Sequence, residues 1–193
     1  MKYVDEFLNL TCAPLLLPLF PNAKEVTESF GAFNAVRGHL PHNFQDDNIT
    51  VFCVGDGHLP RTGATFACRT KWTVYSIDPL LHMKACRVAR LTQINKKIEA
   101  CDKFINMDHD AIIVAVHSHA PLLSSIDRLK FKSIAIIAIP CCVPQTLDKE
   151  PDLRYHDKSI TSPENEVLVW KDVLKINKNG AFVAGNEKNE NSS

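Results

Sequence analysis

One stretch, ITVFCVGDGHLPRTGATFACRTKWTVYSIDP at residues 49–79, constrains the fold more than any other part of the chain. Its first residues, Ile49–Val54, are almost all apolar, which is typical of a strand buried on both faces of a parallel sheet. The strand ends at the turn 55–57, where glycines allow a sharp bend and a close approach of the backbone to a ligand. Apolar spacing then predicts a helix over Thr62–Lys71 and a second strand over Trp72–Ile77. The stretch therefore predicts a strand–helix–strand unit of a parallel α/β sheet.

The second strand ends at an acid whose spacing from the glycine turn is informative. Asp78 follows Gly55 by 78 − 55 = 23 residues, close to the roughly 20 expected between a glycine turn and an acid that binds ribose hydroxyls. The glycine pattern is incomplete, because the next glycine after Gly57 is Gly63 and no lysine follows it. The motif is thus neither a full dinucleotide fingerprint nor a P-loop. It predicts a nucleoside site, with an ordinary ligand-free turn as the alternative.

Two segments of this unit, VFCVGDG at 51–57 and YSIDP at 75–79, resemble the first two motifs of class I S-adenosylmethionine-dependent methyltransferases. The resemblance implies a Rossmann-like sheet and S-adenosylmethionine as cofactor, with the glycine turn under its methionine part and Asp78 on its ribose. The segment KIE at 97–99 resembles the third motif, which flanks the adenine ring, although a surface turn is the alternative. The segment HLPRT at 58–62 departs from the family pattern. The cofactor-binding residues implied are Gly55, Asp56, Gly57, Asp78, Pro79, Ile98, Glu99 and His117.

Two further apolar runs, Ala111–Val116 and Ser133–Ile139, predict buried strands that each end in polar or reactive side chains. The first runs into the histidines of HSHA at 117–120 and the second into Cys141 and Cys142. Ligands of open α/β sheets bind at the carboxyl ends of the strands. These side chains, the glycine turn and Asp78 are therefore expected to converge on one edge of the sheet.

The histidines at this edge suggest a catalytic group. His117 and His119 alternate along an extended segment, so their side chains point in opposite directions unless the chain turns between them. His117 is predicted to lie near the cofactor, as a hydrogen-bond partner or as the catalytic base near neutral pH. The alternative is a histidine packed at the end of a strand with a backbone partner.

The adjacent cysteines allow a metal or a nucleophile, and the sequence favours neither. Cys141 and Cys142 are neighbours, and with one histidine they offer three ligands, whereas a structural zinc site needs about four. A catalytic thiolate needs an electropositive neighbour. The sequence therefore predicts no metal site and assigns the pair to a tight turn.

VHSHA at 116–120 and IPCC at 139–142 together resemble a PCC-containing branch of the S-adenosylmethionine-dependent methyltransferase-like proteins. The resemblance covers about half of the chain, residues 49–144. No Asn-Pro-Pro-Tyr motif of base methylation occurs. The methyl acceptor is therefore unidentified, with RNA as one possibility, and the oligomeric state is open.

The amino-acid composition indicates which partners and which cellular environment suit the chain. Lys and Arg balance Asp and Glu at 22 each, which does not favour a large nucleic-acid footprint. The seven cysteines form no C-x-x-C pair and indicate a reducing, cytoplasmic environment. No membrane span is expected, because Pro14 and Pro18 interrupt the apolar stretch Phe7–Phe20.

The 193 residues predict one main domain with an N-terminal appendage. The expected divisions are a helical and connector segment over 1–48, a Rossmann-like domain over 49–184 and a disordered tail over 185–193. Within the first segment a helix is expected over Ala23–Leu40, with Lys24, Glu25 and Glu28 facing solvent. The other expected elements are helical turns over Leu80–Cys86, a strand over Arg87–Ile94 (or a helix continuing to Ile98), a helical turn over Asp102–Met107, a helix over Leu122–Leu129, an antiparallel pair of Arg154–Ile160 with Glu166–Val173, and an edge strand over Gly180–Val183.

The predicted fold is α/β: a Rossmann-like, doubly wound, mostly parallel sheet with an antiparallel closing hairpin and helices on both faces. The leading functional hypothesis is methyl transfer from S-adenosylmethionine. The alternatives are a non-catalytic relative that acts as a cofactor-binding or interaction subunit, and a nicotinamide-dependent oxidoreductase.

Overall fold

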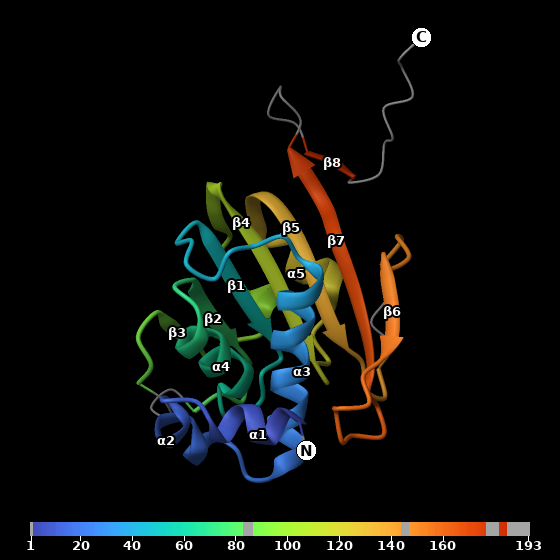
Figure 1. Ribbon diagram of the computed structural model, residues 1–193. Helices are drawn as coiled ribbons and strands as arrows, with labels where there is room; N and C mark the ends of the chain where they lie inside the picture. The colour runs from blue at the N-terminus through green and yellow to red at the C-terminus, as the bar shows by residue number, and fades with distance from the viewer. Residues whose placement is uncertain (1, 83–86, 144–146, 177–181, 185–193) are drawn as a thin grey trace.

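A computed structural model describes residues 2–82, 87–143, 147–176 and 182–184. They form an α/β structure with one eight-stranded sheet (Figure 1), in the order β3-β2-β1-β4-β5-β7-β6, with β8 paired to β7. The first five strands in this order are mutually parallel, and β7 is antiparallel to β5, β6 and β8. The strands are β1 Ile49–Val54, β2 Thr73–Ile77, β3 Leu91–Ile94, β4 Phe104–Val116, β5 Leu129–Ile139, β6 Leu153–His156, β7 Glu166–Ile176 and β8 Phe182–Ala184.

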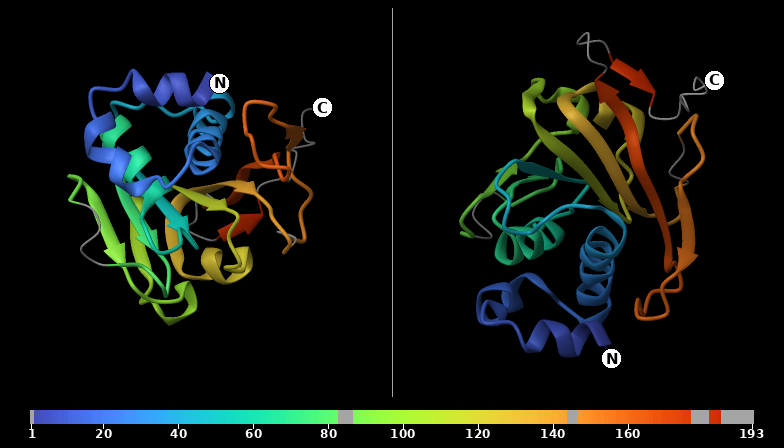
Figure 2. Two further views of the ribbon diagram at one scale, coloured as in Figure 1. Left: turned by 90° about the horizontal axis from the view of Figure 1, so that it is seen from below. Right: turned by 45° about the horizontal axis from the view of Figure 1, so that its top comes forward.

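Helices cover both faces of the sheet, as Figure 2 shows with the sheet nearly edge-on. Most of the helical residues lie on one face, and α5 packs on the other. The helices are α1 Lys2–Leu8, α2 Ala13–Leu16, α3 Ala23–His39, α4 Arg61–Arg69 and α5 Leu122–Asp127, with short 3₁₀ turns η1 Leu17–Leu19 and η2 Ile98–Ala100. The predicted fold class is confirmed.

Burial on both faces explains the apolar strand sequences. Every residue of β1 is buried, and its side chains alternate between the two halves of the core. Val51 and Cys53 join the cluster beneath α3 and α4, whereas Phe52 and Val54 join the cluster on the α5 face. Since both faces of the strand are buried, its residues are apolar except for Thr50 near its start.

Several predicted elements need correction. The prediction of a helical turn over Asp102–Met107 is wrong, because β4 already begins at Phe104. That part of β4 alternates between half-buried and exposed residues, so it lacks the apolar run that marks the strand's inner half. The third strand is confined to Leu91–Ile94, and the competing helix up to Ile98 is absent from the described residues there.

Other boundaries shift by a few residues or lie outside the described part. The helix predicted over Leu122–Leu129 ends at Asp127, because Leu129 already pairs in β5. Residues 80–82 are not helical, and the remainder of the helical turns predicted up to Cys86 lies outside the described residues. The same holds for the predicted tail over 185–193.

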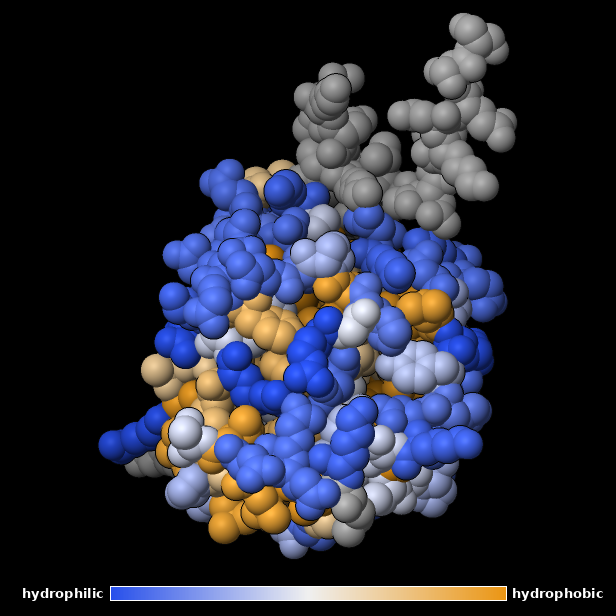
Figure 3. All heavy atoms as spheres, in the orientation of Figure 1, coloured by the Kyte–Doolittle hydropathy of each residue, from blue (hydrophilic) through white to orange (hydrophobic). Residues whose placement is uncertain are grey.

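Helices α1 and α2 and the 3₁₀ turn η1 leave several leucines at the surface, and Figure 3 shows apolar colour over this end of the molecule. The side chains of Leu8, Leu15 and Leu17 are about half exposed or more. Within the described residues, no helix has both the length and the apolar character that crossing a membrane requires.

The aromatic cluster on the α5 face is the first place to test the packing. Phe52 is fully buried, with its ring centroid 5.1 Å from Tyr75, 5.0 Å from Phe104 and 5.5 Å from Phe131. Phe52→Ala should lower the free energy of unfolding by about 3–5 kcal/mol, because it removes a large apolar side chain and leaves a cavity.

Urea denaturation followed by circular dichroism measures this change. Ile105→Ala is the matched control, because Ile105 also lies in the sheet but is 63% exposed, and its effect should stay within about 0.5 kcal/mol. Equal effects of the two substitutions would contradict the proposed packing.

Candidate functional site

The backbone bend after β1 brings two segments into close contact. Gly55 and Gly57 have φ angles of 68° and 77°, the left-handed region that glycine adopts without steric cost. The Gly55 N–H donates to the carbonyl of Ile77 at 2.8 Å, which joins the end of β1 to the end of β2. A Cβ at Gly55 would lie 2.1 Å from the Oγ of Ser118. The bend therefore fits only a glycine at this position.

The acid at the end of β2 lies directly against this bend. One carboxylate oxygen of Asp78 accepts the Gly57 N–H at 3.0 Å, and the other accepts the Leu80 N–H at 2.7 Å. A carboxylate offers about four acceptor positions, and these two hydrogen bonds from described residues occupy only two of them. The juxtaposition of acid and glycine turn expected from their spacing is present.

An open cavity of about 520 Å³ lies beside this contact, within the size range of small-molecule sites. Ile77, Leu80 and Lys96 also line it. Seven of the eight residues expected to bind a cofactor line it together: Gly55, Gly57, Asp78, Pro79, Ile98, Glu99 and His117. The structure therefore brings the predicted residues to one hollow at the carboxyl edge of the parallel strands.

Asp56 is the exception, because its carboxylate is engaged at the N-terminus of α4. It accepts the N–H groups of Thr62 and Gly63 at 3.0 and 2.9 Å and the hydroxyl of Ser76 at 2.7 Å. Burial raises the pKa of Asp56 to about 6, while these hydrogen bonds oppose that rise. Since the first N–H groups of α4 are already occupied, this helix end is poorly suited to the pyrophosphate of a dinucleotide.

His117 turns the chain at the end of β4. Its φ angle is 48°, and this turn lets both His117 and His119 line the cavity instead of pointing apart. The ring of His117 lies between two protein oxygens: Nδ1 is 3.4 Å from Oε1 of Glu28, and Nε2 is 3.3 Å from the carbonyl oxygen of Glu164.

The prediction that Glu28 faces solvent is wrong. Its side chain is only 3% exposed, and the same Oε1 lies 2.8 Å from Nζ of Lys24. A buried carboxylate is tolerated when cations neutralise it. With Lys24, Glu25 and Arg61, Glu28 lines a smaller polar hollow of about 160 Å³ on the α3 side of the glycine bend.

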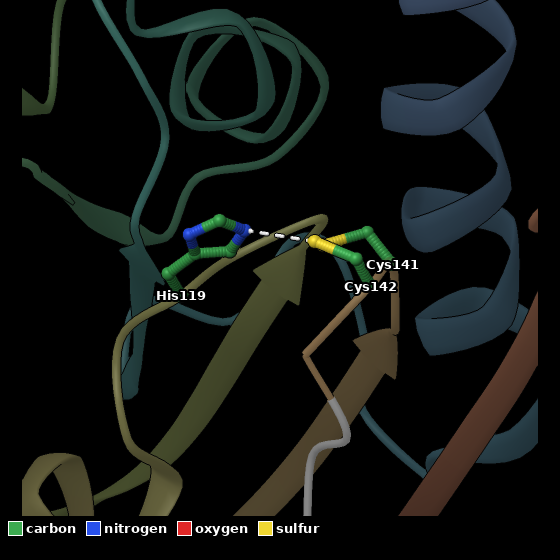
Figure 4. Close-up of side chains that lie close together, drawn as sticks. All are labelled: His119, Cys141 and Cys142. Atoms are coloured by element: carbon green, nitrogen blue, oxygen red, sulfur yellow. Dashed lines mark hydrogen bonds between the residues drawn. The ribbon is translucent and has the colours of Figure 1, made fainter.

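The cysteine pair reaches the same edge from β5. The two sulfur atoms lie 3.8 Å apart, and Sγ of Cys142 is 3.5 Å from Nε2 of His119 (Figure 4). The thiol of Cys141 donates to the carbonyl of His117 at 3.7 Å. The hydrogen bond with Cys141 raises the pKa of Cys142, which disfavours a reactive thiolate at that position.

Sequence reasoning missed part of this site. Ser118 is buried, and its Oγ both crowds Gly55 and accepts the Ala120 N–H at 3.0 Å. A serine two residues before a chain reversal is a known turn signal, but it does not predict contact with a distant glycine. The contribution of Glu28 carried no local signal, because its partner is far along the chain.

Comparison with solved structures supports the fold. A mutant of MtNAS in complex with S-adenosylmethionine is 15% identical in sequence to this chain. The match covers 89% of this chain and 71% of the MtNAS chain, with a TM-score of 0.52. Phosphoethanolamine N-methyltransferase 1 of Haemonchus contortus, in complex with phosphoethanolamine and S-adenosylhomocysteine, is 11% identical and covers 99% of this chain and 49% of its own at a TM-score of 0.49. No family model and no curated protein matches the chain. At these identities the likeness to MtNAS shows a shared fold.

Two glycine substitutions test the bend. Gly55→Ala forces a positive φ on alanine and drives its Cβ into Ser118, so it should lower the free energy of unfolding by at least about 1–3 kcal/mol. Gly38→Ala on α3 meets nothing within 4 Å and should stabilise the helix by up to about 1 kcal/mol.

Chemical denaturation of both variants beside the unmodified protein measures the two changes. Opposite signs are expected from the same pair of residue types. A neutral Gly55→Ala would mean that the bend and Ser118 do not approach as closely as described.

Proposed function

We propose that the chain binds S-adenosylmethionine in the cavity of about 520 Å³ and transfers its methyl group to an acceptor. The observation that carries the proposal is the contact between the Asp78 carboxylate and the Gly57 N–H at the edge of that cavity. An acid beside a bare backbone bend suits a nucleoside, whose ribose presents two hydroxyl donors.

The lining of the cavity supports an orientation for the cofactor. The ribose hydroxyls would bind Asp78, and the adenine would lie against the buried side chain of Ile98 with Glu99 beside it. The methionine part would cross Gly55 and Gly57 toward His117. In this orientation the methyl group lies toward the ends of β4 and β5.

In methyl transfer the main role of the protein is to position the cofactor and the acceptor. The sulfonium of the cofactor makes its methyl carbon electrophilic, so the protein has to bind the cofactor, align the acceptor and exclude competing reactions. His117 as a catalytic base, RNA as the acceptor, membership of the PCC-containing branch and a cytoplasmic location stay predictions. The first two depend on which molecule accepts the methyl group.

One observation favours the second candidate, a cofactor-binding module without transfer activity. Both ring nitrogens of His117 contact protein oxygens, from Glu28 and Glu164, so a base at this position would have to give up one of these contacts to take a proton. Incubation with radiolabelled S-adenosylmethionine and separate pools of RNA, protein and small molecules distinguishes the two candidates. Label transfer to any pool supports the methyltransferase, and binding without transfer supports the module.

The cofactor proposal itself is tested by calorimetry with S-adenosylhomocysteine. Asp78→Asn replaces one acceptor oxygen by an amide donor and removes the charge, so the affinity should fall about 10–100-fold, because a hydrogen bond to a charged group is worth about 1.5–3 kcal/mol. Asp47→Asn is the control: it also removes one negative charge, but Asp47 is exposed before β1, at the opposite end of that strand.

Thermal unfolding of both variants without ligand shows whether they remain folded. The absence of S-adenosylhomocysteine binding by the unmodified protein would refute the proposal, and equal losses in the two variants would remove Asp78 from the site.

A further inference from the structure

We propose that His119, Cys141 and Cys142 form a binding site for a thiophilic divalent cation, Zn²⁺ in the first place. Each offers one ligand atom, and the three atoms lie within 4.8 Å of one another. Figure 4 shows the imidazole of His119 directed at the sulfur of Cys142, with Cys141 behind it. Two thiolates and an imidazole form a ligand set that zinc prefers in proteins.

Two of the three separations between the ligand atoms match those of a tetrahedral zinc site. With Zn–S distances of about 2.3 Å and Zn–N distances of about 2.0–2.1 Å, tetrahedral angles place two sulfurs about 3.8 Å apart and a sulfur about 3.6 Å from a nitrogen. The corresponding distances are 3.8 Å between Cys141 and Cys142 and 3.5 Å between Cys142 and His119. The third pair, the sulfur of Cys141 and the nitrogen of His119, lies within 4.8 Å.

The backbone explains why adjacent cysteines can share one ion here. Consecutive side chains point apart in a strand, but β5 ends at Ile139 and the chain bends at Cys142. Both sulfurs therefore lie on the same side of the bend. The turn at His117 brings His119 to them from the neighbouring strand β4. The sequence predicts no metal because three ligands fall short of the four of a structural site, whereas an open zinc site needs only three protein ligands.

Among the described residues, the site has three ligands and a fourth side without one. Three protein ligands with a free fourth position are the arrangement of catalytic zinc sites, whereas structural sites are closed by four ligands. His119 also lines the cavity beside the glycine bend, so the fourth position is accessible to water or to a molecule that enters from there. His119 and Cys142 are exposed and Cys141 is half-buried, which leaves the ion a path from solvent.

The inference does not rest on the proposed methyl transfer, and metal binding is measured without it. The full chain is reduced, stripped of metal with a chelator and titrated with Zn²⁺ against a chromophoric zinc indicator, and with Co²⁺ to record the charge-transfer absorption of cobalt thiolates. One equivalent of Zn²⁺ and a cobalt–thiolate band are expected.

Single variants identify the ligands. Cys141→Ser, Cys142→Ser and His119→Ala should each weaken Zn²⁺ binding. The loss should be at least as large as that caused by substitutions in the outer shell of a metal site, about 10–100-fold. Cys12→Ser removes a thiol from the N-terminal segment and should leave the affinity and the cobalt spectrum unchanged. Thermal unfolding of the metal-free variants shows that they are folded.

Two results would overturn the proposal. One is an unmodified protein that binds no Zn²⁺ under reducing conditions, and the other is a Zn²⁺ affinity that the three ligand variants leave unaltered.

Discussion

The hydrogen bond from the Gly57 N–H to the carboxylate of Asp78 is the contact on which the site depends. It exists because β1 and β2 run parallel in a register that pairs Val54 with Ile77, so both strands end at the same level. The left-handed conformation at Gly57, which glycine adopts without steric cost, accompanies the donation of its N–H to the acid. A shift of one residue in this register would send Asp78 to the other face of the sheet. The apolar pattern of the two strands therefore fixes the site as well as the core.

A buried charge cluster joins the N-terminal segment to this edge. Burying a lone carboxylate costs several kcal/mol, and the carboxylate of Glu28 on α3 lies beside Lys24 of its own helix and beside the ring of His117 at the end of β4. The apolar side of α3 meanwhile shares one core cluster with the strands. The N-terminal segment is thus packed on the strands, and α3 lines the smaller hollow beside the glycine bend.

Sequence alone predicts the parts of this fold whose signal is local. The inner strands β1, β4 and β5 carry apolar runs of four to six residues because both faces of the sheet are covered, and the spacing from Gly55 to Asp78 follows from one strand–helix–strand unit. The first residues of β4 escape detection because there the strand alternates, with one side exposed. The burial of Glu28 and the position of Ser118 against Gly55 escape it because their partners lie far away in the chain. Asp56 is different, because its carboxylate accepts the N–H groups of Thr62 and Gly63 only a few residues further along the chain, at the start of α4.

The kind of side chain at the carboxyl edge of the sheet changes from strand to strand. Moving from β2 through β1 and β4 to β5, the strand ends carry first Asp78, then the glycine bend, then His117 and His119, and finally the cysteine pair. The side chains suited to a nucleoside therefore lie at one end of this line and those suited to proton transfer or metal binding at the other. Because neighbouring strands are about 4.8 Å apart, a ligand that grips Asp78 and lies across the bend ends within reach of the histidines. The order of the parallel strands thus places the Asp78 carboxylate at one end of this edge and the cysteine pair at the other.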